Sequence, residues 1–168
     1  MAYNVIEVSQ HVINYSINNG KPVTNLKLQK ILYYIQAAFL TEFDEECFEE
    51  DIQHWRHGPV IPKVYSEYKK YMDRGITDIQ NEYNEIYLDK DVKFSIRNII
   101  YREENFMKED LKLMNKVIDS YLDMDPWDMV DKTHEEEPWL NTFTNDIISK
   151  SSIKDFFEVN YERIYGGL

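Results

Sequence analysis

The stretch TNLKLQKILYYIQAAFLTEF, residues 24–43, carries the strongest helical pattern in this chain. Its apolar residues recur at intervals of three and four, as one face of an α-helix requires: Leu28, Ile31, Leu32, Ile35 and Phe39. Thr24 precedes the pattern, where its hydroxyl can cap the first helical turn. Three polar residues lie off the apolar face: Lys27, Lys30 and Gln36. Because the apolar arc is wide, we expect this helix to lie at the centre of the fold.

Five other segments carry helical spacing or residues that typically begin and end helices. They are 5–18, closed by Gly20 and Pro22; 62–74, opened by Pro62 and closed by Gly75; 108–124; 126–139, opened by Pro126 and restarted by Pro138; and 151–165, where Ser152 and Asp155 resemble a capping box. The segment 76–105 mixes alternation with helical character, which indicates a short hairpin there.

The pattern as a whole predicts a mainly α fold. We expect a single compact helical domain over residues 1–168, with a small β-hairpin or short sheet near residues 48–55 and 76–96. Apolar residues make up 43% of the chain, which is enough for a proper core at this length. No internal repeat or linker-like tract divides the sequence.

The charge balance is strongly acidic, with 19 basic against 31 acidic residues and a net charge of −12. Nucleic-acid affinity comes largely from Lys and Arg that neutralise phosphates, so we expect no direct nucleic-acid binding. Cys47 is the only cysteine, which excludes an internal disulfide and a cysteine-rich zinc site. The sequence shows neither a signal peptide nor the ~20-residue apolar run of a membrane span. We therefore expect a cytoplasmic protein without a membrane partner.

Residues 50–65, EDIQHWRHGPVIPKVY, concentrate side chains that often form sites. His54 and His57 are three apart, which could place two imidazoles on one helical face as metal ligands. Gly58-Pro59 follows at once, however, and a residue before proline is pushed away from helical geometry. A zinc site also needs further ligands that this pattern does not mark. We expect no metal here, with His54 and His57 as weak candidates only.

A corner in the chain explains the same stretch better. In this interpretation an extended segment ends at Trp55, Gly58-Pro59 turns the chain, and Pro62 starts the next helix. Trp55 and Tyr65 would then anchor the corner in the core. The role of His57 stays open.

Other catalytic patterns are absent from the sequence. His134-Glu135 begins like the metalloprotease motif H-E-x-x-H, but Pro138 stands where the second histidine belongs. Cys47 lies among acidic residues, which disfavour a reactive thiolate. The chain has no G-x-S-x-G elbow and no glycine-rich phosphate loop. We expect no catalytic residues, no cofactor and no enzymatic activity.

Tyrosines step by three along the segment after Pro62: Tyr65, Tyr68 and Tyr71. Packing in the core or at its rim is the default interpretation of such a stripe. A surface that binds a partner is the alternative, because Tyr and Trp dominate interface hot spots. On that alternative, His57, Tyr68 and Tyr71 are the candidate partner-binding residues.

Three blocks, taken in order, resemble the Panacea domain, the family of SocA-type antitoxins and phage-associated GepA proteins. They are TNLKLQKILYYIQAAFL (24–40), FEEDIQHWRHGPVIPKVYSEYKKY (48–71) and VDKTHEEEPW (130–139). The motif-bearing part covers about residues 5–140. The shared positions, which mark the scaffold of the domain, are Thr24, Leu28, Gln29, Tyr33, Trp55, Gly58, Pro59, Pro62, Tyr65, His134, Pro138 and Trp139.

The resemblance implies an antitoxin that binds a cognate toxin protein directly. In SocA-type members it also implies delivery of the toxin to the ClpXP protease. Residues 76–105 and the tail after Trp139 match no family motif, so we expect partner specificity to reside there.

Two other classes of function remain open at this stage. One is a phage or mobile-element counter-defence inhibitor, whose clustered carboxylates would imitate nucleic acid and bind in a salt-sensitive way. The other is a small metal-dependent hydrolase, which would require His54, His57 and His134 to converge on a cleft.

Overall fold

A computed structural model describes residues 2–168 and confirms a mainly helical chain, with strands in two small antiparallel sheets. The α-helices are α1 (Val5–Asn18), α2 (Asn25–Glu42), α3 (Pro62–Tyr68), α4 (Lys108–Tyr121), α5 (Pro126–His134), α6 (Glu137–Leu140) and α7 (Lys150–Val159). The strands are β1 (Ile52–Trp55), β2 (Gly58–Val60), β3 (Glu82–Leu88), β4 (Phe94–Ile100) and β5 (Ile147–Ile148). Three 3-10 helices complete the regular structure: η1 (Lys69–Tyr71), η2 (Glu103–Asn105) and η3 (Tyr161–Tyr165).

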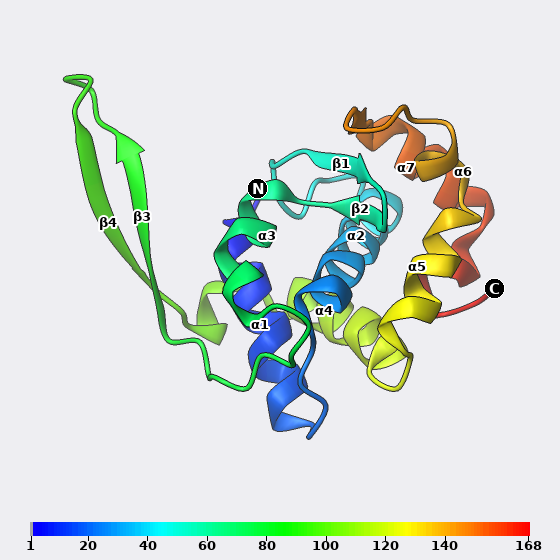
Figure 1. Ribbon diagram of the computed structural model, residues 1–168, viewed down its shortest axis with the longest axis horizontal. Helices are drawn as coiled ribbons and strands as arrows, with labels where there is room; N and C mark the ends of the chain where they lie inside the picture. Colours follow the sequence, from blue (N-terminus) through cyan, green and yellow to red (C-terminus); the bar gives the residue numbers. More distant parts are fainter. Residues whose placement is uncertain (1) are drawn as a thin grey trace.

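Helix α2 is the axis around which the other helices pack, as its sequence predicts (Figure 1). Thr24 caps it by accepting a hydrogen bond from the Lys27 amide at 3.2 Å. Helices α1, α4, α5 and α7 all contact it. The Tyr34 ring stacks on Tyr121 of α4, with centroids 4.7 Å apart. Buried apolar residues from Val5 to Ile164 form one continuous cluster, which supports the proposal of a single domain over residues 1–168.

The central position expected for α2 extends to its polar residues, because fifteen of its 18 residues are buried and Lys27, Lys30 and Gln36 are among them. Its polar side chains bind the backbone of the segments around it. Gln36 accepts from the Cys47 amide at 2.7 Å and donates to the Phe48 carbonyl at 2.8 Å. Gln29 accepts from the Ile61 amide at 2.9 Å. Buried polar groups need such partners, so these contacts allow the helix to be enclosed.

The EDIQHWRHGPVIPKVY segment forms two strands of a three-stranded sheet with order β2-β1-β5. The extended stretch ends at Trp55, as predicted, and Pro62 begins α3. The chain turns at Arg56 and His57, however, while Gly58 and Pro59 belong to β2. The two-residue strand β5 pairs with β1 through Ile148 and was not predicted, since it is too short to show alternation.

The predicted hairpin exists and is longer than expected, with β3 and β4 paired from Glu82↔Ile100 to Leu88↔Phe94. It projects from the helical body as an arm (Figure 1). Four apolar side chains are solvent-exposed on one face near its tip: Ile86, Leu88, Phe94 and Ile96. The Asn84–Asn98 pair separates them from exposed Ile100 on the same face.

Several helix boundaries differ from the predictions. Helix α3 ends at Tyr68 and gives way to η1, so the predicted helix to residue 74 is too long. Helix α7 is capped by Ser149 rather than Ser152, because the Ser149 hydroxyl accepts from the Ser152 amide at 3.1 Å. The predicted helix 151–165 breaks at Asn160 before η3. Within residues 2–168, no helix is long and apolar enough to cross a membrane.

We predict that Gly58→Ala destabilises the protein far more than Gly20→Ala. Both glycines have positive φ, 106° for Gly58 and 69° for Gly20, which costs an L-residue about 1–2 kcal/mol. A Cβ at Gly58 would also lie 2.6 Å from Lys30 Cε and 2.7 Å from Thr133 Oγ1, whereas Gly20 has open space. We expect the free energy of unfolding, measured with urea, to fall by roughly 3 kcal/mol or more for Gly58→Ala and by about 1–2 kcal/mol for Gly20→Ala. Equal losses would contradict the packing argument.

Candidate functional site

The Trp139 indole lies between two imidazole rings and joins the motif blocks. Its ring stacks on His54 at a centroid distance of 4.0 Å and on His134 at 4.1 Å, with interplanar angles of 14° and 17°. Two rings so close to one indole cannot share a face, so the histidines lie on opposite faces of Trp139. We call these three residues the Trp139 stack.

Hydrogen bonds fix the Trp139 stack to the β1–β2 corner. The Trp139 indole N–H donates to the Trp55 carbonyl at 3.0 Å. The His54 ring donates from Nδ1 to the Trp139 carbonyl at 2.8 Å, because a carbonyl can only accept. Burial lowers the pKa of His134, the charge of Lys30 lowers it further, and a hydrogen bond to the Arg56 backbone opposes both effects. The stack therefore holds the corner against α5 and α6.

Lys30 lies behind this corner with its side chain fully buried. Its ammonium donates to the Pro59 carbonyl at 3.2 Å, and no carboxylate pairs with it among the described residues. Burial lowers its pKa from 10.5 to about 7. Gly58 passes so close to Lys30 and Thr133 that no larger residue fits without displacement. The glycine in the motif is therefore explained by close packing.

An open pocket of about 350 Å³ lies on the outer side of the same corner. We call it the aromatic pocket, and it is lined by Asn25, Leu26, Gln29, Trp55, Arg56, His57, Val60, Tyr65, Lys69, Met72, Asp73 and Trp127. Two edge-to-face ring pairs shape it. Trp55 packs against Tyr65 and His57 packs against Trp127, each with centroids 5.0 Å apart. The lining comes from α2, the β1–β2 turn, the α3–η1 region and α5.

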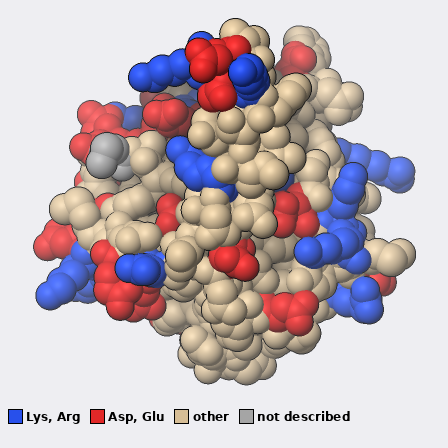
Figure 2. Space-filling model, turned by 90° about the vertical axis from the view of Figure 1, so that its left-hand side faces the viewer, with Lys and Arg blue, Asp and Glu red and all other residues tan. Residues whose placement is uncertain are grey.

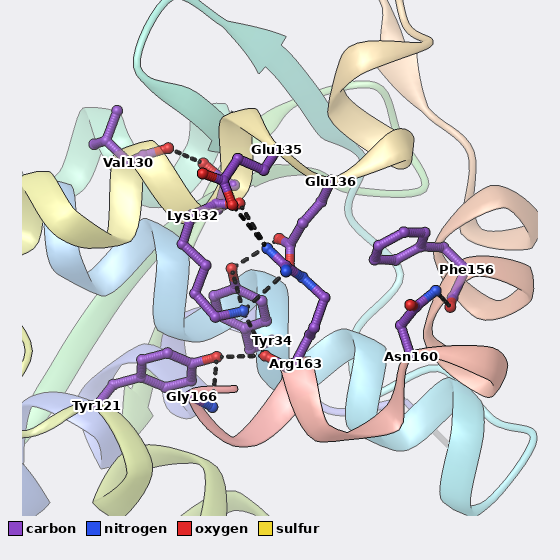
Figure 3. Close-up of polar contacts among 11 residues, drawn as sticks. Tyr34, Tyr121, Val130, Lys132, Glu135, Glu136, Phe156, Asn160, Arg163 and Gly166 are labelled. Atoms are coloured by element: carbon purple, nitrogen blue, oxygen red, sulfur yellow. Dashed lines mark hydrogen bonds and ion pairs between the residues drawn. The ribbon is translucent and has the colours of Figure 1, made fainter. Parts of the chain in front are cut away.

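A buried ion cluster lies on the other side of α5 and is drawn in Figure 3. The Glu136 carboxylate is fully buried and pairs with Lys132 at 3.1 Å and with Arg163 at 3.0 Å. The Tyr34 hydroxyl donates to the same carboxylate at 2.8 Å. Lys132 also lies over the Tyr34 ring, 4.4 Å from its centroid. Since the four residues come from α2, the α5–α6 region and η3, the cluster ties the C-terminal segment to the core.

The histidines proposed as weak metal candidates do not share a cleft. His54 and His134 face the two sides of Trp139, and His57 faces Trp127 at the aromatic pocket. Among residues 2–168, no group of three or more His, Cys, Asp or Glu side chains could hold a metal ion. The convergence that a metal-dependent hydrolase would require is therefore missing from this part of the chain.

The scaffold positions divide into buried and exposed sets. Fully or nearly buried are Leu28, Gln29, Tyr33, Gly58, Pro59 and Pro138. Partly exposed are Thr24, Trp55, Pro62, His134 and Trp139. Tyr65 is 38% exposed, so the prediction that Trp55 and Tyr65 anchor the corner in the core is wrong. They instead pack on each other and form one wall of the aromatic pocket.

The candidate partner-binding residues also separate. His57 is exposed at the aromatic pocket. Tyr68 is 2% exposed, which places it in the core and out of reach of a partner. Tyr71 is partly buried and donates to Asp78 at 2.8 Å. The tyrosine stripe therefore runs from the pocket into the core.

Sequence reasoning missed Trp127, Arg56 and Lys69 at the pocket and the members of the ion cluster. One signal was available, because Lys132 and Glu136 are four residues apart with opposite charges. Nothing in the sequence marks Arg163 as the third member. Nor does any local pattern place Trp127 beside His57, seventy residues earlier, since only the packing of α5 on the corner brings them together.

Comparison with known proteins identifies the family. Residues 28–140, more than half of the chain, match the family described as antitoxin SocA-like, Panacea domain. This chain belongs to that family, as its motif blocks predicted. It is also 39% identical over 44 residues to antitoxin SocA from Caulobacter vibrioides (strain NA1000 / CB15N), a match that covers 26% of this chain and 23% of that relative. The match thus spans about a quarter of the relative, and no solved structure matches the chain.

Lys30→Met should stabilise the protein at neutral pH, and the advantage should shrink as the pH rises. The pKa of Lys30 is about 7 when folded against 10.5 in the unfolded chain, so above about pH 7 the unfolded chain binds more protons and stability increases with pH. Between about pH 7 and 8.5, we expect the free energy of unfolding of wild type to rise relative to that of the variant by up to about 1.4 kcal/mol per pH unit. Urea unfolding of both proteins across this range tests it. A pH-independent difference would show that Lys30 keeps an ordinary pKa.

Glu136→Gln should lower the free energy of unfolding by about 3–5 kcal/mol, because it leaves Lys132 buried without a counter-charge and Arg163 with only the more distant, exposed Glu135. Glu135→Gln is the matched control. The Glu135 side chain is 67% exposed and 3.6 Å from Arg163, so its loss should cost under about 1 kcal/mol. Similar melting temperatures for the two variants would mean that the buried cluster contributes no more than a surface pair.

Proposed function

We propose that this chain is an antitoxin that neutralises a cognate toxin by direct protein–protein contact, without catalysing a reaction. The observation that carries the proposal is the family match over residues 28–140. The local match to a protein named as an antitoxin points the same way. The His54, His57 and His134 arrangement supports it further, because these rings pack against tryptophans and do not surround a reaction site.

In this proposal, the aromatic pocket is the surface that contacts the protein partner. Tyr65 and Trp127 are 38% and 55% exposed there, and both are residue types that dominate binding hot spots. The Trp139 stack and Lys30 hold the wall of the pocket from behind. A partner would therefore meet a preformed surface, which reduces the entropy cost of binding.

Partner specificity, in this proposal, resides partly in the β3–β4 arm. The arm lies within the segment that carries no family motif, and its apolar face is open to solvent. Phe94 is 80% exposed at the tip and Ile96 is 72% exposed. Such a surface can change between relatives without disturbing α2, so toxins of different shape could be matched by different arms.

Nucleic-acid mimicry by a counter-defence inhibitor finds less support. A mimic requires carboxylates that cover one face without interruption. Figure 2 shows the side from which the arm projects, where acidic and basic side chains lie in adjacent clusters among uncharged surface. Lys63 bridges Glu50 and Glu85, which illustrates how basic residues neutralise acidic ones there. This face does not fit a mimic.

Co-expression with the product of the adjacent gene tests the proposed function. We expect that product to arrest growth when it is expressed alone, and this chain to restore growth by forming a complex that co-purifies with it. An unrelated acidic helical protein of similar size serves as the control. A harmless neighbouring product, or toxicity that this chain does not relieve, would contradict the proposal.

Delivery of the toxin to a ClpXP-type protease makes a separate prediction. If this chain only masks the toxin, neutralisation should persist in a host that lacks the protease, and the half-life of the toxin should stay unchanged. If the chain is an adaptor, relief of toxicity should disappear in that host. A pulse-chase measurement of the toxin with and without the chain separates these outcomes.

A further inference from the structure

We infer that the aromatic pocket binds an extended acidic segment of the partner protein, anchored by one aromatic side chain. This inference rests on the proposed function for the identity of the partner, and it concerns the chemistry of the pocket itself. The pocket volume of about 350 Å³ lies at the small end of ligand pockets, so it suits one large side chain with its adjoining backbone.

The apolar part of the pocket is suited to an aromatic anchor. Trp127, Tyr65 and Met72 line it, and as whole residues they are 55%, 38% and 75% exposed. Aromatic rings gain about 0.5–1.5 kcal/mol beyond area burial when they meet edge-to-face or offset. The Tyr65 hydroxyl and the Trp127 indole N–H have no hydrogen-bond partner in residues 2–168, so both remain free to bind the polar groups of a ligand.

The charge of the pocket is opposite to that of the chain as a whole. Its lining includes Arg56, His57 and Lys69, and Asp73 is the single carboxylate among the lining residues. Neither Arg56 nor Lys69 forms an ion pair with any described residue, so both charges remain open to a ligand. In a chain with a net charge of −12, a lining with two such cations and one carboxylate is a local exception.

Charge complementarity therefore favours an acidic ligand, because opposite potentials steer encounter and like charges suppress wrong partners. A peptide fits better than a nucleotide or another polyphosphate. Trp127 lies in the first turn of α5, where the Asp125 carboxylate already accepts from its backbone amide at 2.8 Å. Asp128 adds a second negative charge to that turn. A compact polyphosphate would bring its charge close to these carboxylates, whereas an extended peptide can place its uncharged aromatic anchor at Trp127 and its acidic flanks at Arg56 and Lys69.

Peptide binding to the full-length protein tests the inference directly. The probe is a fluorescein-labelled nonapeptide with a central Phe flanked on both sides by Asp and Glu, followed by fluorescence anisotropy. Two control peptides carry Ala at the centre or Lys in the flanks. We expect at least about tenfold weaker binding for each control peptide, and weaker binding of the parent peptide at high salt.

Variants locate the binding. Trp127→Ala and Arg56→Glu should each weaken binding of the Phe-centred peptide about tenfold or more. Phe143→Ala and Lys112→Glu are matched controls, since both residues are exposed and lie outside the pocket lining and the β3–β4 arm. Thermal melts of all four variants check that folding is unchanged. Equal affinity in the pocket variants and the controls would overturn the inference.

Further outcomes separate this inference from the proposed function. If wild type neutralises the toxin and Trp127→Ala and Arg56→Glu do so equally well, the pocket is not the contact surface, although the antitoxin function stands. If wild type fails to neutralise but the acidic peptide binds in a Trp127-dependent manner, the pocket chemistry holds and the proposed function falls. Tighter binding of ATP or of the Lys-flanked peptide, self-association lost in Trp127→Ala, or no peptide binding at millimolar concentration each overturns the inference.

Discussion

The burial of α2, in which fifteen of 18 residues are enclosed, is the constraint on which the rest of this structure depends. A helix so enclosed needs hydrogen-bond partners for the polar side chains that it buries, since an unpaired buried group costs about 1–3 kcal/mol. Gln29, Lys30 and Gln36 meet this demand by binding the backbone of residues 47–61. In return, that irregular segment is held in one conformation. Helix α2 thus positions the β1–β2 corner, although a connecting segment separates the two in the sequence.

Positioning of the corner has consequences on both of its sides. Toward the interior, Trp55 accepts a hydrogen bond from Trp139 through its carbonyl, and the Trp139 stack joins the corner to α5 and α6. Toward solvent, the Trp55 side chain packs on Tyr65 and lines the aromatic pocket. A single residue therefore serves the scaffold through its backbone and the surface through its ring. This double use places a family motif residue in the wall of the pocket that we propose as a binding surface.

Charge is organised differently in the core and at the surface. Glu136 is enclosed with Lys132 and Arg163, where removing one partner leaves an uncompensated ion. Lys30 is enclosed without any carboxylate and responds by a lowered pKa. At the aromatic pocket, Arg56 and Lys69 remain in water without partners, which makes them available to a ligand. The overall charge of −12 describes none of these sites.

Local patterns in the sequence identified α2, its Thr24 cap, the other long helices, the strand ending at Trp55 and the hairpin between residues 76 and 105. These features depend on side-chain periodicity and on residues with special backbone preferences, which act over a few positions. The three motif blocks identified the family for the same reason, because each is a short contiguous string.

The tertiary structure alone decided the surroundings of those elements. Lys27, Lys30 and Gln36 are buried in the folded chain. The turn lies at Arg56 and His57, not at the predicted Gly58-Pro59. The two-residue strand β5 pairs with β1. The tertiary structure also brought Trp127 to His57 and Arg163 to Glu136. These contacts join residues that are far apart in the chain, and their energies depend on burial and on close packing. A one-dimensional pattern carries no information about either, so the candidate site became visible only when the chain was folded.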